Sequence, residues 1–192
     1  MARRLIREGP NDMDNKYYEM TIAGCKRRLP LCAVNDKLDI AAFIMFSDVE
    51  ITVASAKALA EKAPECDIII TAECKGIPLA YEMAKQMNIP YVVARKSTKL
   101  YMINPVSVKV KSVTTAAEQT LCISESEAEM MRGRRVLIAD DVISTGESLT
   151  AIEKLVESAE GNIVGRCAVL AEGDAAERED IFYLEKLPLF FK

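Results

Sequence analysis

Two adjacent aspartates, Asp140 and Asp141, stand between an apolar run at residues 136–139 and a turn of small residues at 144–148. Backbone N–H groups and hydroxyls at the start of a helix favour a phosphate, because the helix dipole places partial positive charge there. The two carboxylates cannot serve the same phosphate, since like charges repel. They suit the hydroxyl groups of a sugar. The segment therefore predicts a site for a sugar phosphate.

The segments around these aspartates alternate between strand and helix patterns. Apolar runs predict strands at residues 68–71, 91–94, 136–139 and 163–170. Helical spacing of apolar residues predicts helices at residues 48–62, 79–87 and 146–158. Strands that are apolar on both faces indicate an α/β fold with a central parallel sheet flanked by helices. In such a sheet, ligands bind at the carboxyl ends of strands, where Asp140 is expected.

Two further features complete the predicted organisation. Ser47 and Glu50 have the spacing of a capping box at the start of the first helix. Two alternating segments, 106–113 and 118–124, predict a hairpin that projects from the core.

Composition excludes several classes of function. The net charge of −4 argues against a nucleic-acid partner held by diffuse electrostatic attraction. The absence of histidine excludes Ser-His-Asp triads, Cys-His dyads and His-ligated zinc. Six cysteines without a CxxC pair indicate reduced thiols in a cytoplasmic protein. Charged residues interrupt the longest apolar stretch, so no membrane span is expected.

The run 136–148 resembles the signature of the type I phosphoribosyltransferases that binds 5-phosphoribosyl 1-pyrophosphate (PRPP). Neither GxxxxGK nor GxGxxG, the competing phosphate loops, occurs in the chain. The resemblance implies that Asp140 and Asp141 are catalytic, binding the ribose hydroxyls and stabilising a cation-like ribosyl group. It implies that the 5-phosphate is enclosed by Ser144, Thr145, Gly146, Glu147 and Ser148. Glu147 and Ser148 stand where the family often has a small residue and a threonine.

Residues 71–78 resemble the pyrophosphate loop of the same family, and 90–96 resemble the strand and basic loop that follow it. The resemblance implies contacts to pyrophosphate from Glu73, Cys74, Lys75, Gly76, Arg95, Lys96 and Lys99. Lys75 replaces the arginine of the adenine enzymes, which exchanges a bidentate fork for a point charge. Glu118 lies near a loop glutamate of those enzymes, but we interpret it as an exposed loop charge.

The resemblance extends over residues 66–170 and implies the type I phosphoribosyltransferase fold. After a polar leader at 1–16, a single domain would occupy 17–192. Its expected parts are a hood segment at 17–46, a core at 47–170 with a flexible loop at 97–125, and a tail at 171–192 that contributes to the hood. The implied cofactor is magnesium, held mainly by PRPP and water, and the implied assembly is a homodimer.

The function implied by the resemblance is a purine phosphoribosyltransferase of purine salvage, with PRPP and a purine base as substrates. Adenine is favoured, giving AMP and pyrophosphate, and a xanthine or guanine enzyme is the alternative. A non-catalytic PRPP-sensing regulator would need a DNA-binding module, and no basic helical segment precedes residue 47. A catalytically silent oligomerisation module would bind PRPP without releasing pyrophosphate.

Overall fold

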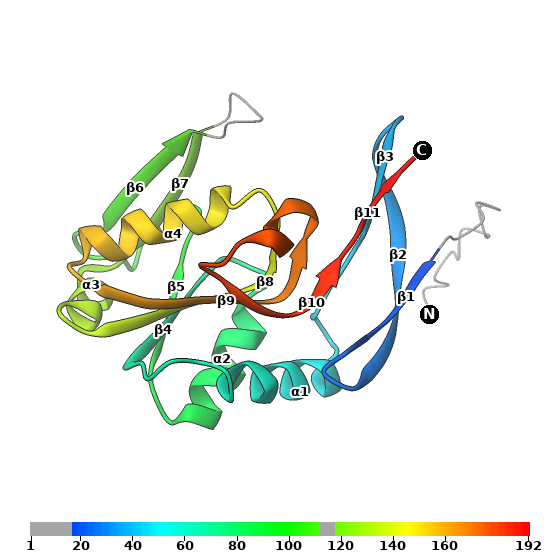
Figure 1. Ribbon diagram of the computed structural model, residues 1–192. Coiled ribbons are helices and arrows are strands. Elements are labelled where there is room, and N and C mark those ends of the chain that lie inside the picture. Colours follow the sequence, from blue (N-terminus) through cyan, green and yellow to red (C-terminus); the bar gives the residue numbers. More distant parts are fainter. Residues whose placement is uncertain (1–16, 112–117) are drawn as a thin grey trace, which may run out of the picture.

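The computed structural model describes residues 17–111 and 118–192. Its core is a five-stranded sheet of order β10-β9-β8-β4-β5 in which every neighbouring pair is parallel (Figure 1). The strands are β4 (Ile68–Ala72), β5 (Tyr91–Ala94), β8 (Arg135–Ile143), β9 (Asn162–Glu172) and β10 (Phe182–Leu187). The predicted α/β class with a central parallel sheet is confirmed.

Helices cover both faces of this sheet. α1 (Val49–Ala60) and α2 (Ile77–Met87) lie on one face, and α4 (Glu147–Ser158) lies on the other with the short α3 (Glu125–Met131). In β4, Ile69 packs in the same cluster as residues of α1 and α2, whereas Ile68 and Ile70 pack with α4. Burial on both faces explains why every position of β4 is apolar or small.

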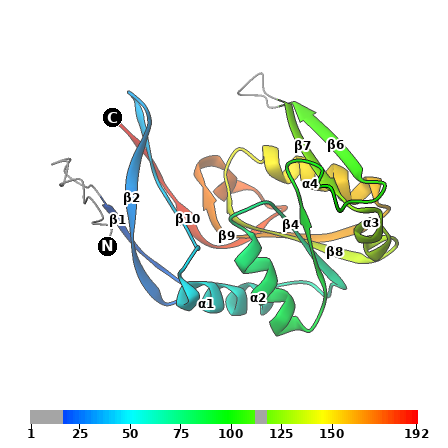
Figure 2. The same ribbon diagram turned by 180° about the vertical axis from the view of Figure 1, so that it is seen from behind.

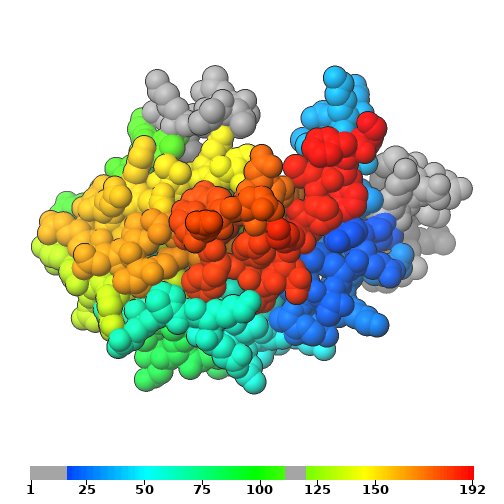
Figure 3. All heavy atoms as spheres, viewed as in Figure 1, coloured from blue at the N-terminus to red at the C-terminus, as the bar shows by residue number. Residues whose placement is uncertain are grey.

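A second sheet, which we call the hood sheet, stands beside the core (Figure 2). Its order is β1-β2-β3-β11, all antiparallel, with strands β1 (Tyr17–Ile22), β2 (Cys25–Asn35), β3 (Leu38–Ala41) and β11 (Leu189–Phe191). The predicted tail thus contributes to both sheets. After the 3₁₀ helix η1 (Gly173–Glu177), β10 joins the core sheet and β11 joins the hood sheet, with Pro188 between them. Figure 3 shows this end of the chain beside the N-terminal strands.

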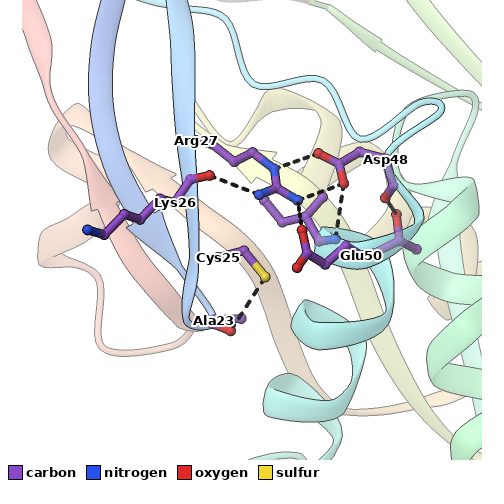
Figure 4. Close-up of polar contacts among 8 residues, drawn as sticks. Ala23, Cys25, Lys26, Arg27, Asp48 and Glu50 are labelled. Carbon is purple, nitrogen blue, oxygen red and sulfur yellow. Dashed lines mark hydrogen bonds and ion pairs between the residues drawn. The ribbon is translucent and has the colours of Figure 1, made fainter.

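The start of α1 differs from the predicted capping box. The N-cap is Asp48, whose side chain accepts a hydrogen bond from the N–H of Ile51 at 3.2 Å, and Ser47 lies outside the helix with φ of 66°. With Asp48 as the N-cap, the N3 position is Ile51 and not Glu50, and the Glu50 carboxylate instead accepts a hydrogen bond from Arg27 at 2.7 Å. Arg27 also donates to Asp48 at 2.7 Å, so this ion-pair cluster joins β2 of the hood sheet to α1 (Figure 4).

The projecting hairpin is confirmed. It consists of β6 (Val106–Lys111) and β7 (Glu118–Ile123), paired antiparallel from Val106↔Ile123 to Lys111↔Glu118. It packs on the α4 side of the core, where Val110 and Leu121 are buried. Residues 112–117, the tip of the predicted flexible loop, lie outside the described residues, as do the side chain of Glu118 and the polar leader at 1–16.

Two properties of the described chain bear on earlier expectations. No helix within residues 17–111 and 118–192 has the length and apolar character needed to cross a membrane. All six cysteines are free thiols, and Cys66, Cys122 and Cys167 are buried.

Candidate active site

The two aspartates project from β8 itself, and the predicted end of this strand at residue 139 is wrong. Pairing with β9 continues to Ile143↔Ala171, whereas pairing with β4 stops at Ile138↔Ile70. Asp140 and Asp141 therefore lie on the part of β8 that has only one neighbouring strand. The other side of this part faces the loop that follows β4.

The two carboxylates have different electrostatic environments. Asp141 is only 3% exposed, and its Oδ2 atom lies 2.6 Å from the Nζ atom of Lys75. Asp140 accepts a hydrogen bond from the N–H of Asp141 at 2.8 Å. Burial and the adjacent charge of Asp141 raise the pKa of Asp140 well above its usual range. In this pair the charge of Asp141 is neutralised by Lys75, whereas ionisation of Asp140 is energetically unfavourable.

A small pocket of about 40 Å³ lies where β8 turns into α4. It is lined by Asp140, Val142, Ile143, Ser144, Thr145, Gly146, Glu147, Ser148 and Leu149. Gly146 is the N-cap of α4 with φ of 78°, a left-handed conformation that glycine adopts without steric cost. All five residues predicted to enclose a 5-phosphate meet in this pocket, at a helix N-terminus that suits an anion.

A second pocket of about 210 Å³ adjoins the first. Its lining consists of Ala72, Glu73, Cys74, Lys75, Lys96, Asp140, Asp141, Val142 and Ser148. Four of the predicted pyrophosphate residues are in this set: Glu73, Cys74, Lys75 and Lys96. The two pockets share Asp140, Val142 and Ser148, so together they form one hollow with the aspartates at the join.

The loop after β4 lies close against β8 because residue 76 is a glycine. A Cβ atom on Gly76 would lie 2.9 Å from Oδ1 of Asp140 and would also meet the hydroxyl of Thr71. Gly76 is the N-cap of α2, and the Glu73–Cys74 peptide bond is cis. The basic loop after β5 reaches the same place, since the N–H of Lys96 donates to Glu73 at 3.0 Å. This contact and the nearby cations lower the pKa of Glu73.

Two of the predicted pyrophosphate residues, Arg95 and Lys99, do not line the second pocket. The guanidinium of Arg95 contacts the hydroxyl of Tyr101 at 3.3 Å and lies 3.9 Å from the carboxylate of Glu127. Lys99 lies 3.9 Å from the carboxylate of Glu73. Neither side chain is among the described residues that line the second pocket. Their contact with pyrophosphate stays a prediction.

Several residues at this site were not predicted from the sequence, and three of them bear on its geometry. Val142 lines both pockets and lies inside the motif, so its place between the aspartates and the turn could have indicated a role in the site. Thr71 is buried against Gly76, and its hydroxyl has no hydrogen-bond partner among the described residues. Arg178, which follows η1, places Nη1 at 2.7 Å from the position of a Cβ atom on Gly146. No local pattern could have revealed Arg178, because the contact joins distant parts of the chain.

The two carboxylates between the pockets suit a magnesium ion that binds together with a phosphate-bearing substrate. The described residues contain no group of three or more His, Cys, Asp or Glu that could hold a metal by themselves. Asp140 and Asp141 supply carboxylate oxygens beside the second pocket. Mg²⁺ is commonly bound through one or two carboxylates together with substrate phosphates and water.

Comparison with known proteins places this geometry in a family. Residues 48–188 match the model of the phosphoribosyl transferase domain. An adenine phosphoribosyltransferase of Rhodococcus jostii is 34% identical over 76% of this chain and 78% of its own length. A hypoxanthine/guanine phosphoribosyltransferase of Methanococcus voltae is 38% identical over 58% of this chain and 56% of its own length.

Two further similarities extend the comparison. A purine biosynthesis transcriptional repressor of Bacillus subtilis is 32% identical over 59% of this chain, which spans only 39% of the repressor. Among solved structures, adenine phosphoribosyltransferase from Thermoanaerobacter pseudethanolicus superposes with a TM-score of 0.63 at 24% identity, covering 74% of this chain and 84% of that one. At that identity the superposition shows the fold alone. With the matched domain, these findings confirm the resemblance: the chain belongs to the phosphoribosyl transferase domain family.

Proposed function

We propose that this protein is a purine phosphoribosyltransferase that transfers ribose 5-phosphate from PRPP to adenine and releases pyrophosphate. The observation that carries the proposal is the join of two pockets at Asp140, Val142 and Ser148. One pocket has the small residues and helix N-terminus that suit a phosphate monoester. The other has Lys75 and Lys96, whose charges suit pyrophosphate. A ligand with a phosphate at each end of a ribose matches this order.

In the proposed reaction, the bond from ribose C1 to the pyrophosphate oxygen breaks while a ring nitrogen of the base forms a bond to C1. The bonding electron pair leaves with pyrophosphate, and the proton on the attacking nitrogen passes to solvent. Asp140 and Asp141 bind the ribose hydroxyls, and their negative charge stabilises the positive charge that develops on the ribosyl group. Lys75 and Lys96 stabilise the leaving group.

Lys75 has two partners in this scheme. Its ammonium lies on Asp141, so it must turn toward pyrophosphate as PRPP binds. The side chain is 44% exposed, which leaves its ammonium accessible to a ligand in the second pocket. Magnesium, bound with PRPP near Asp140 and Asp141, would neutralise charge on the pyrophosphate.

The choice of adenine rests on similarity. The adenine enzyme of Rhodococcus jostii aligns with 76% of this chain, whereas the hypoxanthine/guanine enzyme of Methanococcus voltae aligns with 58%. A guanine or xanthine enzyme is the alternative. The hood sheet is the proposed site of the base, since it is the part of the chain that flanks the core. The homodimer, the cytoplasmic location and the single domain at 17–192 stay predictions.

The test is a product assay. The protein is incubated with PRPP and magnesium, and separately with adenine, hypoxanthine, guanine, xanthine and orotate, and nucleotide formation is measured. We expect AMP from adenine. Formation of another purine nucleotide would correct the acceptor, and no product with any base would refute the enzyme.

A PRPP-sensing regulator is the second candidate, favoured by the 32% identity to the Bacillus subtilis repressor. The two functions differ in turnover. A regulator binds PRPP and releases no pyrophosphate with any base. It also binds DNA, with an affinity that depends on PRPP and on the salt concentration. The product assay and a gel shift separate them.

A further inference from the structure

The turn that would hold the 5-phosphate carries no cation of its own. Residues 144–148 contain no lysine or arginine, and Glu147 adds a carboxylate at the first position of α4. A phosphate in this pocket would depend on backbone N–H groups, hydroxyls and the helix dipole, with a negative side chain on the same turn. Positive charge near this turn must come from another part of the chain.

Arg178 supplies that charge from the segment between η1 and β10. Its Nη1 atom lies 2.7 Å from where a Cβ atom on Gly146 would be, so the guanidinium stands directly against the turn. Gly146 has no Cβ and adopts φ of 78°, and both properties permit this approach. Arg178 is not among the described residues that line the pocket, so it lies behind Gly146.

The orientation of this guanidinium is fixed by Asp180. Nε of Arg178 donates to Oδ1 of Asp180 at 2.8 Å, and Nη2 donates to Oδ2 at 2.6 Å. This fork uses two of the three nitrogens and turns Nη1 toward Gly146. The side chain is 33% exposed, and the carboxylate of Asp180 raises the pKa of Arg178, so the cation is kept.

We propose that Arg178 is a positioning residue for the 5-phosphate, held by Asp180, which supports the Gly146 turn and places a fixed positive charge behind it. The inference rests on the proposed function. It assigns the C-terminal tail a role in binding PRPP. A purely structural role, in which the Arg178 and Asp180 fork only stiffens the tail, is the competing explanation.

The experiment measures two ligands that occupy different pockets. Dissociation constants of ribose 5-phosphate and of pyrophosphate are determined by calorimetry for the wild type, R178Q, R178K and D180N. We expect R178Q to lower the affinity for ribose 5-phosphate about tenfold, because one favourable charge contact is lost. The affinity for pyrophosphate should be unchanged. R178K keeps the charge without the fork, so its affinity should be intermediate. D180N should also be intermediate, because the guanidinium loses its orientation.

K186Q is the matched control, since Lys186 is a cation of the same tail that pairs with Glu177 at 2.8 Å. It should bind both ligands as the wild type does. Equal affinity of R178Q and wild type for ribose 5-phosphate would overturn the inference. An equal loss for both ligands with a lower melting temperature would also overturn it, in favour of the structural role. A wild type that binds neither ligand would refute the proposed function and this inference with it.

Discussion

The Nζ atom of Lys75 lies 2.6 Å from Oδ2 of Asp141, so an ion pair joins the loop after β4 to the strand that carries the two aspartates. Only 3% of Asp141 is exposed, whereas Lys75 reaches solvent. The buried carboxylate therefore depends on this lysine when no substrate is bound.

Replacing Lys75 with glutamine should weaken both binding and folding. Asp141 would become a buried charge without its partner, and we expect the free energy of unfolding to fall by about 1–2 kcal/mol, less than for a fully buried pair. Affinity for pyrophosphate should fall about tenfold. K85Q is the control, because Lys85 pairs with Glu82 on α2 at 3.2 Å and contacts neither pocket. Denaturant titration and calorimetry measure both effects. Unchanged pyrophosphate affinity in K75Q would contradict the assigned role.

Asp140 and Asp141 should respond in opposite directions to replacement by asparagine. Burial and Asp141 raise the pKa of Asp140 to about 8, above its value in the unfolded chain. Folding therefore disfavours the ionised form, and wild-type stability is lost as pH rises from about 4 to about 8. D140N removes this loss and should raise the free energy of unfolding at pH 8 by about 1 kcal/mol, with a smaller gain at pH 5. D141N should lower it, since Lys75 loses its partner.

Both substitutions should lower turnover by about 100-fold: each removes a carboxyl oxygen that binds the ribose hydroxyls, and D141N also removes negative charge beside the ribosyl group. Thermal denaturation at several pH values and steady-state kinetics provide the two measurements. The stability of D140N at pH 8 falling below that of the wild type would contradict the electrostatic assignment. Near wild-type turnover in both variants would contradict the catalytic one.

Gly76 is expected to tolerate no side chain. In G76A the new methyl would meet Asp140 and Thr71, which forces the loop away from β8. PRPP affinity should fall about tenfold or more, and unfolding should become easier by about 1–3 kcal/mol. The double variant T71A/G76A removes one of the two obstacles and should recover part of both losses. T71A alone is the control, because the hydroxyl it removes makes no hydrogen bond in the described structure. Failure of the double variant to improve on G76A would contradict the steric explanation.

Cys74 offers a direct test of where pyrophosphate binds. Cys74 and Cys32 are the exposed thiols, but only Cys74 lines the second pocket. Pyrophosphate should slow alkylation of Cys74 several-fold while Cys32, in the hood sheet, reacts at an unchanged rate. Mass spectrometry of the labelled peptides gives both rates from one sample. Protection of neither thiol at saturating pyrophosphate would place the ligand elsewhere.

Replacing Arg27 should affect the KM for the base more than the KM for PRPP. Its guanidinium joins the hood sheet to Asp48 and Glu50 of the α1 region. R27A should lower the free energy of unfolding by about 1 kcal/mol and raise KM for adenine more than KM for PRPP, because the hood loses a fixed orientation. R28A is the matched control, since neighbouring Arg28 pairs with Glu19 and lies over the ring of Tyr17, both on β1 of the hood sheet. An equal rise of both KM values in R27A would contradict a hood-specific effect.

The sequence predicted the parts of the fold in which one local pattern dominates. β4 and residues 136–139 of β8 are buried on both faces, and the amphipathic α4 follows its glycine. Strand β10 was not recognised because it lies at the sheet edge, where Glu185 and Lys186 are exposed. The short helix α3 was also missed. A capping box does form there, between Ser124 and Glu127, and its spacing could have indicated the helix.

In the candidate site, too, only the residues that belong to one local sequence pattern could be predicted. The motif predicted every residue of the first pocket that lies on the turn, because those residues are consecutive. It could not show that Lys75 contacts Asp141, that Arg95 turns toward Glu127, or that Arg178 stands behind Gly146. Each of these contacts depends on how distant segments pack, which a local pattern does not contain.

The crossing of the tail from one sheet to the other has a practical consequence for redesign. β10 and β11 are separated by Pro188 alone, yet they belong to different sheets, and β11 pairs with β3 from the opposite end of the sequence. The hood sheet is therefore not a cassette that can be transplanted as one continuous piece. A chimaera that borrows the hood of a relative must exchange residues 17–41 and 189–191 together, or β3 will meet an edge partner of foreign sequence.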